Sequence, residues 1–451
     1  MKNEILIKTN AGGSSDLVIH PVKAAEISLG RKKFAVISFG SQKFSASIVI
    51  NDRIPPDQIL LSRKLIATLH LPDHPVYEIS FANQEIILGP FIGLLLSKED
   101  RRLTPSSLKK MLVYVSEYSK LHGVVVVFAL DKVNRVERFM KGYCFDPTHN
   151  SWREGTFPYP SSIYRTIGLS EEWKNHFLSV IGDKLFNSRY FDKWQMYQWF
   201  SIDKVLNRYI PYTTFYHSPQ DVLDMLKKFQ KVYLKPVSGL RGRGIVQISG
   251  ADQLFLFKYH QDQKNYSVTL KNWNDALEYI QKRFAHGRYL IQQAVNLLEH
   301  QGGVVDFRCV VQKNQSNTWV CKAIIGRAGG NGSIVSNISS GGTALPAEEL
   351  LKKILAAPEK EVLIMKERIA ALACNICTTL DEFGIHCGTL GLDIGIDNRG
   401  QLWLIEINNR DPDPTIALDI QDQQLYHDLK TGPLFYAKFL AGFKTDRDNL
   451  S

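Results

Sequence analysis

Three oxygen-bearing side chains lie in an otherwise apolar stretch near the C-terminus. The stretch from Gly388 to Asn408 reads GTLGLDIGIDNRGQLWLIEIN, with two apolar runs around the turn-forming residues DNRG. This pattern predicts two antiparallel strands joined by a tight turn. Asp393 lies in the first strand, and Glu406 and Asn408 lie in the second. Carboxylates are rarely buried unless they are paired or bind a metal, so the hairpin is a candidate functional site.

The polar side chains of this hairpin are of the kinds that bind a hard divalent cation. Side chains alternate along a strand, so Glu406 and Asn408 are expected on one face together with Leu402 and Leu404. A short turn would bring Asp393 of the first strand beside them. Two carboxylates and an amide oxygen suit Mg²⁺ that phosphate groups also hold, with Mn²⁺ as the alternative metal. A strand whose polar face simply lies in water is the other interpretation, and the apolar flanking residues make it the weaker one.

A glycine-rich segment that follows a lysine is a second candidate for phosphate chemistry. Residues 237–244 read VSGLRGRG, directly downstream of Lys235 in the strand pattern KVYLKPV. Glycines let backbone N–H groups approach an anion closely, and a lysine supplies a point charge for phosphate oxygens. The order strand, glycines, strand excludes the P-loop and the Rossmann turn, in which a helix follows the glycines. A basic hairpin turn with a structural role would have the same composition, so this segment alone leaves both interpretations open.

Length and charge describe a globular chain with anionic partners. At 451 residues the chain exceeds the usual size of one domain, so two or three packed units are expected. Its formal net charge of +10 points to nucleotides, nucleic acids or acidic polymers. Because the basic residues are spread along the chain, a local anion pocket is favoured over a nucleic-acid groove.

The sequence also predicts a protein kept in the cytosol. The first residues show no secretory signal, and the longest apolar runs, residues 86–96 and 124–130, are too short to span a bilayer. The six cysteines are few and scattered, as in a reducing compartment. Cys374 and Cys377 form a C-x-x-C within a helical pattern, which favours helix packing over redox or zinc chemistry.

The elements that must position these residues follow from the hydrophobic periodicity. Residues 25–85 are rich in strand patterns, and residues 106–123 predict a helix that leads into a buried strand at 124–130. Farther along, we expect a helix from residue 192 to Pro211 and a second helix capped by Ser218. Strands are then expected on both sides of the glycine-rich segment.

In this order, a lysine-bearing strand, a glycine-rich hairpin, a further strand and an acidic hairpin resemble the ATP-grasp superfamily. The finer motifs are similar to those of the YheC/YheD family of endospore coat-associated ATP-grasp proteins, and they read FDKWQMYQW, YLKPVSGLRGRGI, DFR, GLDIGID and WLIEIN. The likeness covers residues 187–443. It implies an α/β (α+β) fold class, with an ATP-grasp fold in the C-terminal half. The implied domains are a strand-rich domain at 1–85, a small α/β pre-ATP-grasp domain at 86–186, the ATP-grasp domain at 187–443 with a lid at about 212–295, and a tail at 444–451.

The resemblance also implies roles for individual residues. The implied nucleotide-binding residues are Lys193, Lys235, Gly239, Arg241, Gly242, Gly244, Gln293, Ala294, Val295 and Asp306. The implied catalytic residues, which match positions near phosphates or the acceptor, are Arg308, Arg327 and Asn337, and the implied metal ligands are Asp393, Glu406 and Asn408. Three alternatives stay open, namely Lys193 as a solvated helix residue, Arg308 as a structural partner of Asp306, and Asn337 as a residue that only shapes its Ser- and Gly-rich loop.

The activity that the resemblance implies is ATP-dependent ligation. ATP would phosphorylate a carboxylate to an acylphosphate, and an amine or thiol would then displace phosphate. Peptides or envelope polymers are the expected substrates and spore coat proteins the expected partners, whereas nucleic acid is disfavoured. The alternative function is a nucleotide-binding scaffold of the spore coat without ligase turnover. Relatives of the ribosomal-protein glutamate ligase type have a small residue and Pro-Gly soon after the metal-binding Asn, whereas this chain has Arg410 and Asp411, which leaves the acceptor open.

Overall fold

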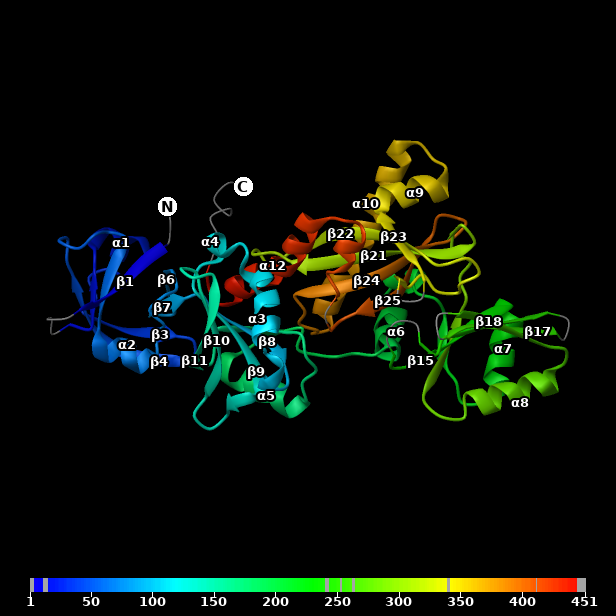
Figure 1. The fold of residues 1–451 in the computed structure, drawn as a ribbon, viewed down its shortest axis with the longest axis horizontal. Coiled ribbons are helices and arrows are strands. Elements are labelled where there is room, and N and C mark those ends of the chain that lie inside the picture. Colours follow the sequence, from blue (N-terminus) through cyan, green and yellow to red (C-terminus); the bar gives the residue numbers. More distant parts are fainter. Residues whose placement is uncertain are drawn as a thin grey trace.

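The computed structural model of the chain describes residues 4–10, 15–239, 243–251, 254–261, 264–338, 341–410 and 412–443. Its strands form four sheets, and Figure 1 shows them spread along the longest axis of the molecule. A closed barrel lies at one end, the second sheet follows, and the fourth sheet lies between the second and the third. This mixed architecture, with a strand-rich N-terminal region, confirms the predicted fold class.

The first sheet is a closed barrel in the order β1-β5-β2-β4-β3-β7-β6. Its strands are β1 (Glu4–Asn10), β2 (Leu17–Ile19), β3 (Phe34–Phe39), β4 (Gln42–Ile50), β5 (Gln58–Ser62), β6 (Tyr77–Ala82) and β7 (Glu85–Gly89), and its helices are α1 (Pro21–Glu26) and α2 (Arg63–Leu69). Because β7 pairs with both β3 and β6, the barrel extends to Gly89, beyond the boundary expected at residue 85. We propose Gly89 as the end of the first domain.

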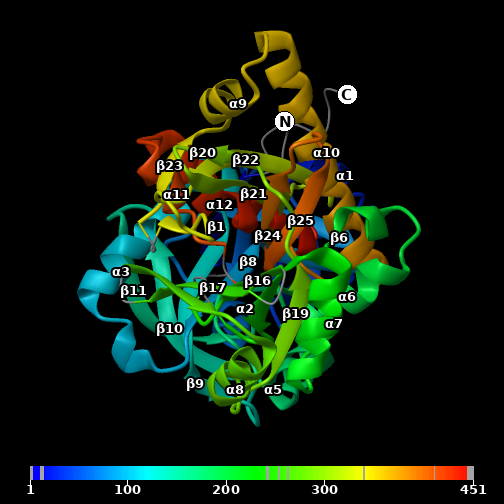
Figure 2. The same cartoon turned by 90° about the vertical axis from the view of Figure 1, so that its right-hand side faces the viewer.

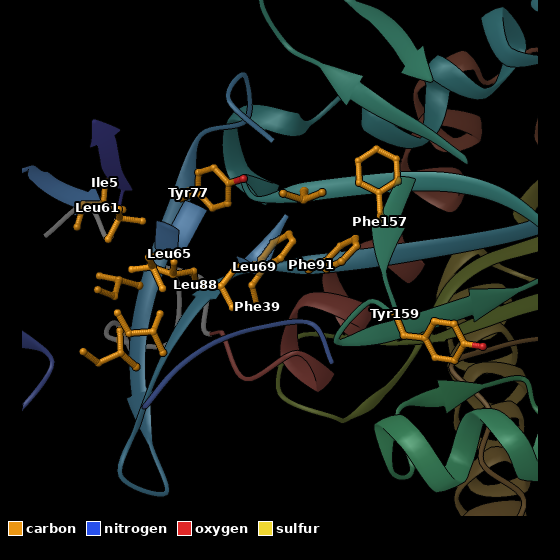
Figure 3. Packing of buried hydrophobic residues seen from close by; sticks show 14 of the residues in the cluster. Ile5, Phe39, Leu61, Leu65, Leu69, Tyr77, Leu88, Phe91, Phe157 and Tyr159 are labelled. Atoms are coloured by element: carbon orange, nitrogen blue, oxygen red, sulfur yellow. The ribbon is translucent and has the colours of Figure 1, made fainter. Parts of the chain in front are cut away.

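The apolar core of the barrel continues into the second sheet. Phe39 of the barrel stacks on Phe91 of the second sheet, with ring centroids 4.5 Å apart. Tyr77 packs edge-on against Phe39, and Figure 3 shows these rings beside Leu88. A closed barrel has no free strand edge, so it joins the rest of the chain through this shared core rather than through strand pairing.

The second sheet has the order β11-β10-β9-β8-β12-β13. Its strands are β8 (Phe91–Ser97), β9 (Val124–Asn134), β10 (Phe139–Asp146), β11 (Ser151–Pro158), β12 (Ser162–Arg165) and β13 (Leu185–Phe186), and α5 (Glu171–Ile181) lies between the last two. Strand β8 is parallel to β9 and β12, and β12 is parallel to β13. The carboxyl ends of these four strands therefore meet at one edge of the sheet.

The single helix predicted over residues 106–123 is wrong. The segment forms α3 (Pro105–Met111), the 3₁₀ turn η2 (Leu112–Val115) and α4 (Tyr118–Leu121), after a first 3₁₀ turn η1 (Asp100–Arg102). At the break, the indole of Trp152 donates to the backbone oxygen of Leu108 at 3.0 Å. A continuing α-helix would offer that oxygen to residue 112, so the tertiary contact competes with the helix.

The third sheet, in the order β14-β19-β15-β16-β17-β18, is called the lid below. Its strands are β14 (Thr213–Phe215), β15 (Lys231–Pro236), β16 (Val246–Ala251), β17 (Leu254–Gln261), β18 (Lys264–Leu270) and β19 (Tyr289–Gln293), with α7 (Pro219–Phe229) and α8 (Trp273–Arg283). The glycine-rich segment connects β15 to β16. Ser218 caps α7 in a capping box with Asp221, which confirms the predicted helix start.

The fourth sheet has the order β23-β22-β21-β24-β25, and β20 pairs with β21. Its strands are β20 (Glu299–His300), β21 (Gly303–Lys313), β22 (Trp319–Ala328), β23 (Thr343–Pro346), β24 (Thr389–Ile396) and β25 (Leu402–Asn408), and its helices are α9 (Ala347–Leu355), α10 (Glu359–Glu382), α11 (Ile416–Asp419) and α12 (Gln423–Leu440). Helix α10 packs on one face through apolar residues that include Cys377. Figure 2, with the lid toward the viewer, shows α9 at the upper edge.

Helix α12 contacts both the second and the fourth sheet. Gln312 of β21 donates to the backbone oxygen of Leu429 at 2.8 Å, and Ser162 of β12 donates to that of Ala437 at 2.8 Å. These buried contacts tie the two sheets together through one helix. Among the helices that the structure describes, none has both the length and the apolarity that a bilayer crossing requires.

Helix α6 (Lys193–Ile202) lies between the second sheet and the lid. The prediction that it continues to Pro211 is wrong, because Asp203 takes an extended backbone conformation and ends it. The carboxylate of Asp203 accepts hydrogen bonds from the backbone of Val205 and Leu206 at 2.8 and 2.7 Å. These bonds start the separate 3₁₀ turn η3 (Leu206–Tyr209).

Candidate active site

One face of the fourth sheet carries a row of charged side chains across three neighbouring strands. Arg308 on β21 pairs in register with Asp393 on β24, and Asp393 pairs in register with Glu406 on β25. Residues directly opposite each other in antiparallel strands point to the same face, so the three side chains lie side by side. The opposite face is apolar and packs on α10. The structure thus places Asp393 opposite Glu406, as the hairpin pattern predicted.

The strict alternation expected along β25 is wrong at one position. The register between β24 and β25 shifts by one residue, which leaves Ile405 unpaired as the extra residue of a β-bulge. Leu402 and Leu404 therefore lie in the apolar core, on the face opposite the one expected. Glu406 and Asn408 follow the bulge and both line a cavity on the other side of the strand.

Two arginines and two aspartates form a buried ion cluster in this face. Asp393 accepts hydrogen bonds from Arg308 at 2.5 and 3.2 Å and forms an ion pair with Arg327 at 2.9 Å. Arg327 also donates to Asp306 at 2.7 and 2.6 Å, and the Ser336 hydroxyl donates to Asp306 at 2.5 Å. The two positive and two negative charges balance, as buried ions require. Arg308 is therefore paired with Asp393, not with Asp306.

This cluster keeps its members ionised. Burial alone would raise the pKa of Asp393, but the charges of Arg308 and Arg327 and their hydrogen bonds lower it to about 2. Burial alone would lower the pKa of Arg327, but Asp306 and Asp393 raise it above the ordinary value. The face of the sheet thus presents fixed charges in a surrounding of low polarity, where each charge acts strongly on a ligand.

Lys235 of the lid lies opposite this face. It is 8% exposed, and its Nζ donates to the side-chain oxygen of Gln292 at 2.6 Å. Burial lowers the pKa of Lys235 to about 8; the carboxylate of Glu406 partly opposes this shift, and the charge of Lys193 adds to it. A lysine in this state is a poorly compensated buried cation, which an anionic ligand would stabilise.

Lys193 is the first residue of α6 and reaches the same place from another direction. Asp192 caps the helix in a capping box with Gln195, which fixes where the helix begins and so where Lys193 lies. The Nζ atom of Lys193 lies 3.0 Å from a carboxylate oxygen of Glu406 and donates to the backbone oxygen of Gly239 at 3.4 Å. Lys193 is therefore paired with Glu406, the neighbour of the cluster, and is not a solvated helix residue.

Two cavities meet at these residues. A narrow cavity of about 80 Å³ lies between the lid and the fourth sheet, and a wide cavity of about 850 Å³ opens beside α6 and the glycine-rich segment. Lys193 and Glu406 line both cavities. The narrow cavity is also lined by the predicted residues Lys235, Gln293, Val295, Asp306, Arg327, Asn337 and Asp393. Ala294 lies between two of the lining residues, and its backbone N–H donates to the backbone oxygen of Lys231 at 3.1 Å.

The glycine-rich segment borders the wide cavity. Gly239 and Arg243 line it, and Gly244 has a φ of +75°, a conformation that favours glycine. Arg241 and Gly242 lie outside the described residues. The described ends of the segment thus share a cavity with Glu406, the last residue of the charged row, where phosphate-binding groups would be needed.

The donor atoms of the β24–β25 hairpin fit a hard divalent cation. Glu406 and Asn408 offer a carboxylate and an amide oxygen to the wide cavity, and Asp393 adds a second carboxylate from the neighbouring strand. Asp393 is shared with two arginines, whereas Glu406 pairs with a single lysine. The described residues contain no group of three or more His, Cys, Asp or Glu side chains spaced for a metal. The expected ligands differ from such a group, because they are the two carboxylates of Asp393 and Glu406 and the amide of Asn408.

Sequence reasoning missed Gln292 and Ser336. The side chain of Gln292 reaches Lys235, whereas that of Gln293 accepts from the backbone of Tyr212 at 3.3 Å. The alternation of side chains along β19 shows that only one of these two adjacent residues faces Lys235, but it does not show which. Ser336 lies in a Ser- and Gly-rich segment, and the composition of that segment does not predict the hydrogen bond from Ser336 to Asp306.

A family model described as YheC/D like ATP-grasp matches residues 182–440, more than half of the chain. The endospore coat-associated protein YheD of Bacillus subtilis (strain 168) is 27% identical over 367 residues, which cover 78% of this chain and 79% of that protein. The endospore coat-associated protein YheC of the same organism is 27% identical over 254 residues, or 55% of this chain and 67% of that protein.

Solved structures are more distantly similar. The VanG D-Ala:D-Ser ligase from Enterococcus faecalis has a TM-score of 0.44 and 9% identity, and the match covers 77% of this chain and 99% of that one. A RimK domain ATP-grasp protein from Sphaerobacter thermophilus has a TM-score of 0.39 and 12% identity, with 77% and 98% covered.

Proposed function

Because the chain belongs to the YheC/D-like ATP-grasp family, we propose that it binds ATP with Mg²⁺ and joins a carboxylate to an amine or thiol. In the proposed reaction, a carboxylate oxygen attacks the γ-phosphorus and ADP leaves. The amine or thiol then attacks the acyl carbon of the acylphosphate, loses a proton and expels phosphate. Bound Mg²⁺, or Mn²⁺, would neutralise phosphate charge, held by Glu406, Asn408 and Asp393.

One observation carries this proposal: Lys193 and Glu406 border both cavities. A nucleotide that enters between the lid and the fourth sheet would place its phosphates beside these two residues and next to the wide cavity. A second substrate in the wide cavity would then meet the phosphates at the same residues. This arrangement supports transfer between two bound molecules, which depends on proximity and on fixed charge.

We propose distinct roles for the basic residues. Lys235 and Lys193 supply positive charge to phosphate oxygens, and the backbone of Gln293, Ala294 and Val295 borders the base. Arg308 and Arg327 act as fixed charges whose positions are set by their carboxylate partners, and Asn337 adds an amide to the wall of the narrow cavity. Closure of the glycine-rich segment over the phosphates would exclude water.

The names of the relatives support a location. Since YheD and YheC are endospore coat-associated proteins, we propose that this chain is linked to the spore coat or the cell envelope, with coat proteins as partners. A peptide or envelope polymer is then the proposed substrate. A coat scaffold that binds nucleotide without turnover is the competing function.

The test is an assay of the full chain with MgATP and a library of carboxylates and amines, in which ADP and phosphate are measured. The ligase proposal predicts ADP release that depends on a particular pair of substrates and is lost in Glu406→Gln. Tight ATP binding without ADP release for any pair would instead favour the scaffold. Loss of ATP binding altogether would contradict both.

A further inference from the structure

A third cavity, of about 270 Å³, lies at the carboxyl edge of the second sheet. It is lined by Leu96, next to the last residue of β8, and by Thr166, which follows the last residue of β12, and residues of α3, η2 and α12 form its other walls. Among the described residues, it shares no lining residue with the narrow or the wide cavity. It is therefore a separate place for a ligand, called the sheet-edge pocket below.

The sheet-edge pocket lies where the chain leaves two parallel neighbours, β8 and β12, toward opposite faces of the sheet. The helical turns that follow β8 pack on one face, where Leu108 of α3 and Leu94 of β8 belong to one apolar cluster. Helix α5, which follows β12, packs on the other face, where Phe177 and Leu95 belong to a different cluster. Ligands of sheets with parallel strands bind outside the carboxyl ends at such a point, because the diverging connections leave a crevice there.

Two lysines from different elements give this pocket a positive charge. Lys110 of α3 and Lys430 of α12 line it, and no Asp or Glu is among its described lining residues. Within the described part of the chain, neither lysine forms an ion pair with a carboxylate. Lys430 is held at the pocket by the buried Tyr114, because its Nζ donates to the Tyr114 hydroxyl at 3.2 Å and lies 4.8 Å from the centroid of that ring. The walls thus present two positive charges without a counter-charge.

We propose that the sheet-edge pocket binds the phosphate group of a small phosphomonoester. Two ammonium groups balance a dianion, whereas a single carboxylate would leave one of them uncompensated. The side chains of Thr166 and Tyr426 also line the pocket and add hydroxyl donors for phosphate oxygens. Pockets for drug-sized ligands measure roughly 300–1,000 Å³, so this smaller volume suits a phosphate with a short organic part rather than a nucleotide. Because the pocket lies outside the proposed active site, this inference goes beyond the proposed ligase function.

Calorimetric titration of the full chain with glycerol 3-phosphate tests the pocket, at a pH above about 7 where a phosphomonoester is close to a dianion. Glycerol and acetate are the comparison ligands at equal ionic strength, and the wild type should bind only the phosphate compound. Lys430→Met should weaken its affinity by about tenfold or more, and Lys110→Met, whose side chain is more exposed, by about threefold or more. Lys109→Met, the exposed neighbour that does not line the pocket, should bind like the wild type.

Two of the variants separate binding from a structural role of Lys430. This lysine joins α12 to η2 through Tyr114, so its loss can also shift the helix. Lys110→Met and Thr166→Val leave that contact in place, and Thr166→Val should weaken the affinity by about threefold or more, since it removes one hydroxyl donor. Weaker binding in Lys430→Met, together with wild-type affinity in both Lys110→Met and Thr166→Val, would show a structural lysine and overturn the proposal.

Three further results would overturn the phosphate pocket. The first is no binding heat with glycerol 3-phosphate at several temperatures, and the second is an equal or higher affinity for acetate. The third is an affinity that Lys110→Met keeps but Lys235→Met loses, since the phosphate would then bind at the proposed nucleotide site. Failure of the proposed ligase function is distinguishable. Binding that needs Lys110 in a protein without ATP turnover leaves the pocket intact, and ATP turnover without such binding removes the pocket alone.

Discussion

Asp393 and Glu406 face each other across β24 and β25, yet their carboxylates have different surroundings. Asp393 is buried and is held by two arginines, whereas Glu406 pairs with Lys193 at the border of two cavities. The strand pair thus presents one carboxylate whose charge the arginines already balance and another that is more exposed to a ligand or metal. We therefore expect Asp393 to contribute mainly to the stability of the fold and Glu406 mainly to the binding of a ligand.

Removing the charge of Asp393 should destabilise the protein. Asp393→Asn leaves Arg308 and Arg327 with one carboxylate between them, and breaking a buried ion pair in this way costs about 3 kcal/mol of unfolding free energy. Glu406→Gln should cost less than about 1 kcal/mol, because this pair is partly exposed. Denaturant unfolding of both variants checks the difference, and equal costs would contradict the division of roles.

Lys235 should dominate binding of nucleotide. Lys235→Met removes a buried ammonium that faces the fourth sheet, and loss of such a charged hydrogen bond weakens binding by about 10- to 100-fold. Lys227→Met, on the exposed side of the same lid, is the matched control and should bind ATP like the wild type. Calorimetric titration with ATP and Mg²⁺ measures both. An unchanged affinity in Lys235→Met would remove this lysine from the site.

Binding of ATP should weaken as the pH rises through about 8. Burial lowers the pKa of Lys235 to about 8, and phosphate oxygens bind only its protonated form. The affinity is expected to be constant below pH 7 and to fall by about tenfold per pH unit well above pH 8. In the unfolded chain the pKa of this lysine is about 10.5, so between pH 8 and pH 10.5 the unfolded state binds more protons than the folded state. The contribution of Lys235 to the stability of the fold therefore rises with pH in this window. Lys235→Met should lack the decrease in affinity.

Gln292 should set the pH at which this loss begins. Its side-chain oxygen accepts a hydrogen bond from the ammonium of Lys235 and so favours the protonated form. Gln292→Leu should shift the midpoint of the pH dependence of ATP binding below 8. The neighbouring variant Gln293→Leu, whose side chain contacts Tyr212 instead, should leave the midpoint in place. If both variants shift it equally, the contact with Lys235 is not the cause.

The sequence predicted the hairpin and its polar residues because alternation and turn chemistry are local properties. Asp393 and Glu406 lie opposite each other because the turn at Asp397–Gly400 is short. The β-bulge at Ile405 was not predictable, since an extra residue leaves no compositional sign in an apolar strand. It reversed the side expected for Leu402 and Leu404.

Long-range contacts account for the other differences. The bond from Trp152 to Leu108 breaks a predicted helix, and no periodicity within residues 106–123 reveals it. The bond between Arg327 and Asp393 links β22 to β24, which are not neighbours in the sheet.

The most direct measurement is a calorimetric titration of ATP into the full chain, with Mg²⁺ and with a chelator in its place. The account predicts binding with Mg²⁺, weakened at least about tenfold by the chelator and to a similar extent by Glu406→Gln. An absence of binding heat at several temperatures, or an affinity that neither metal removal nor Glu406→Gln changes, would contradict it.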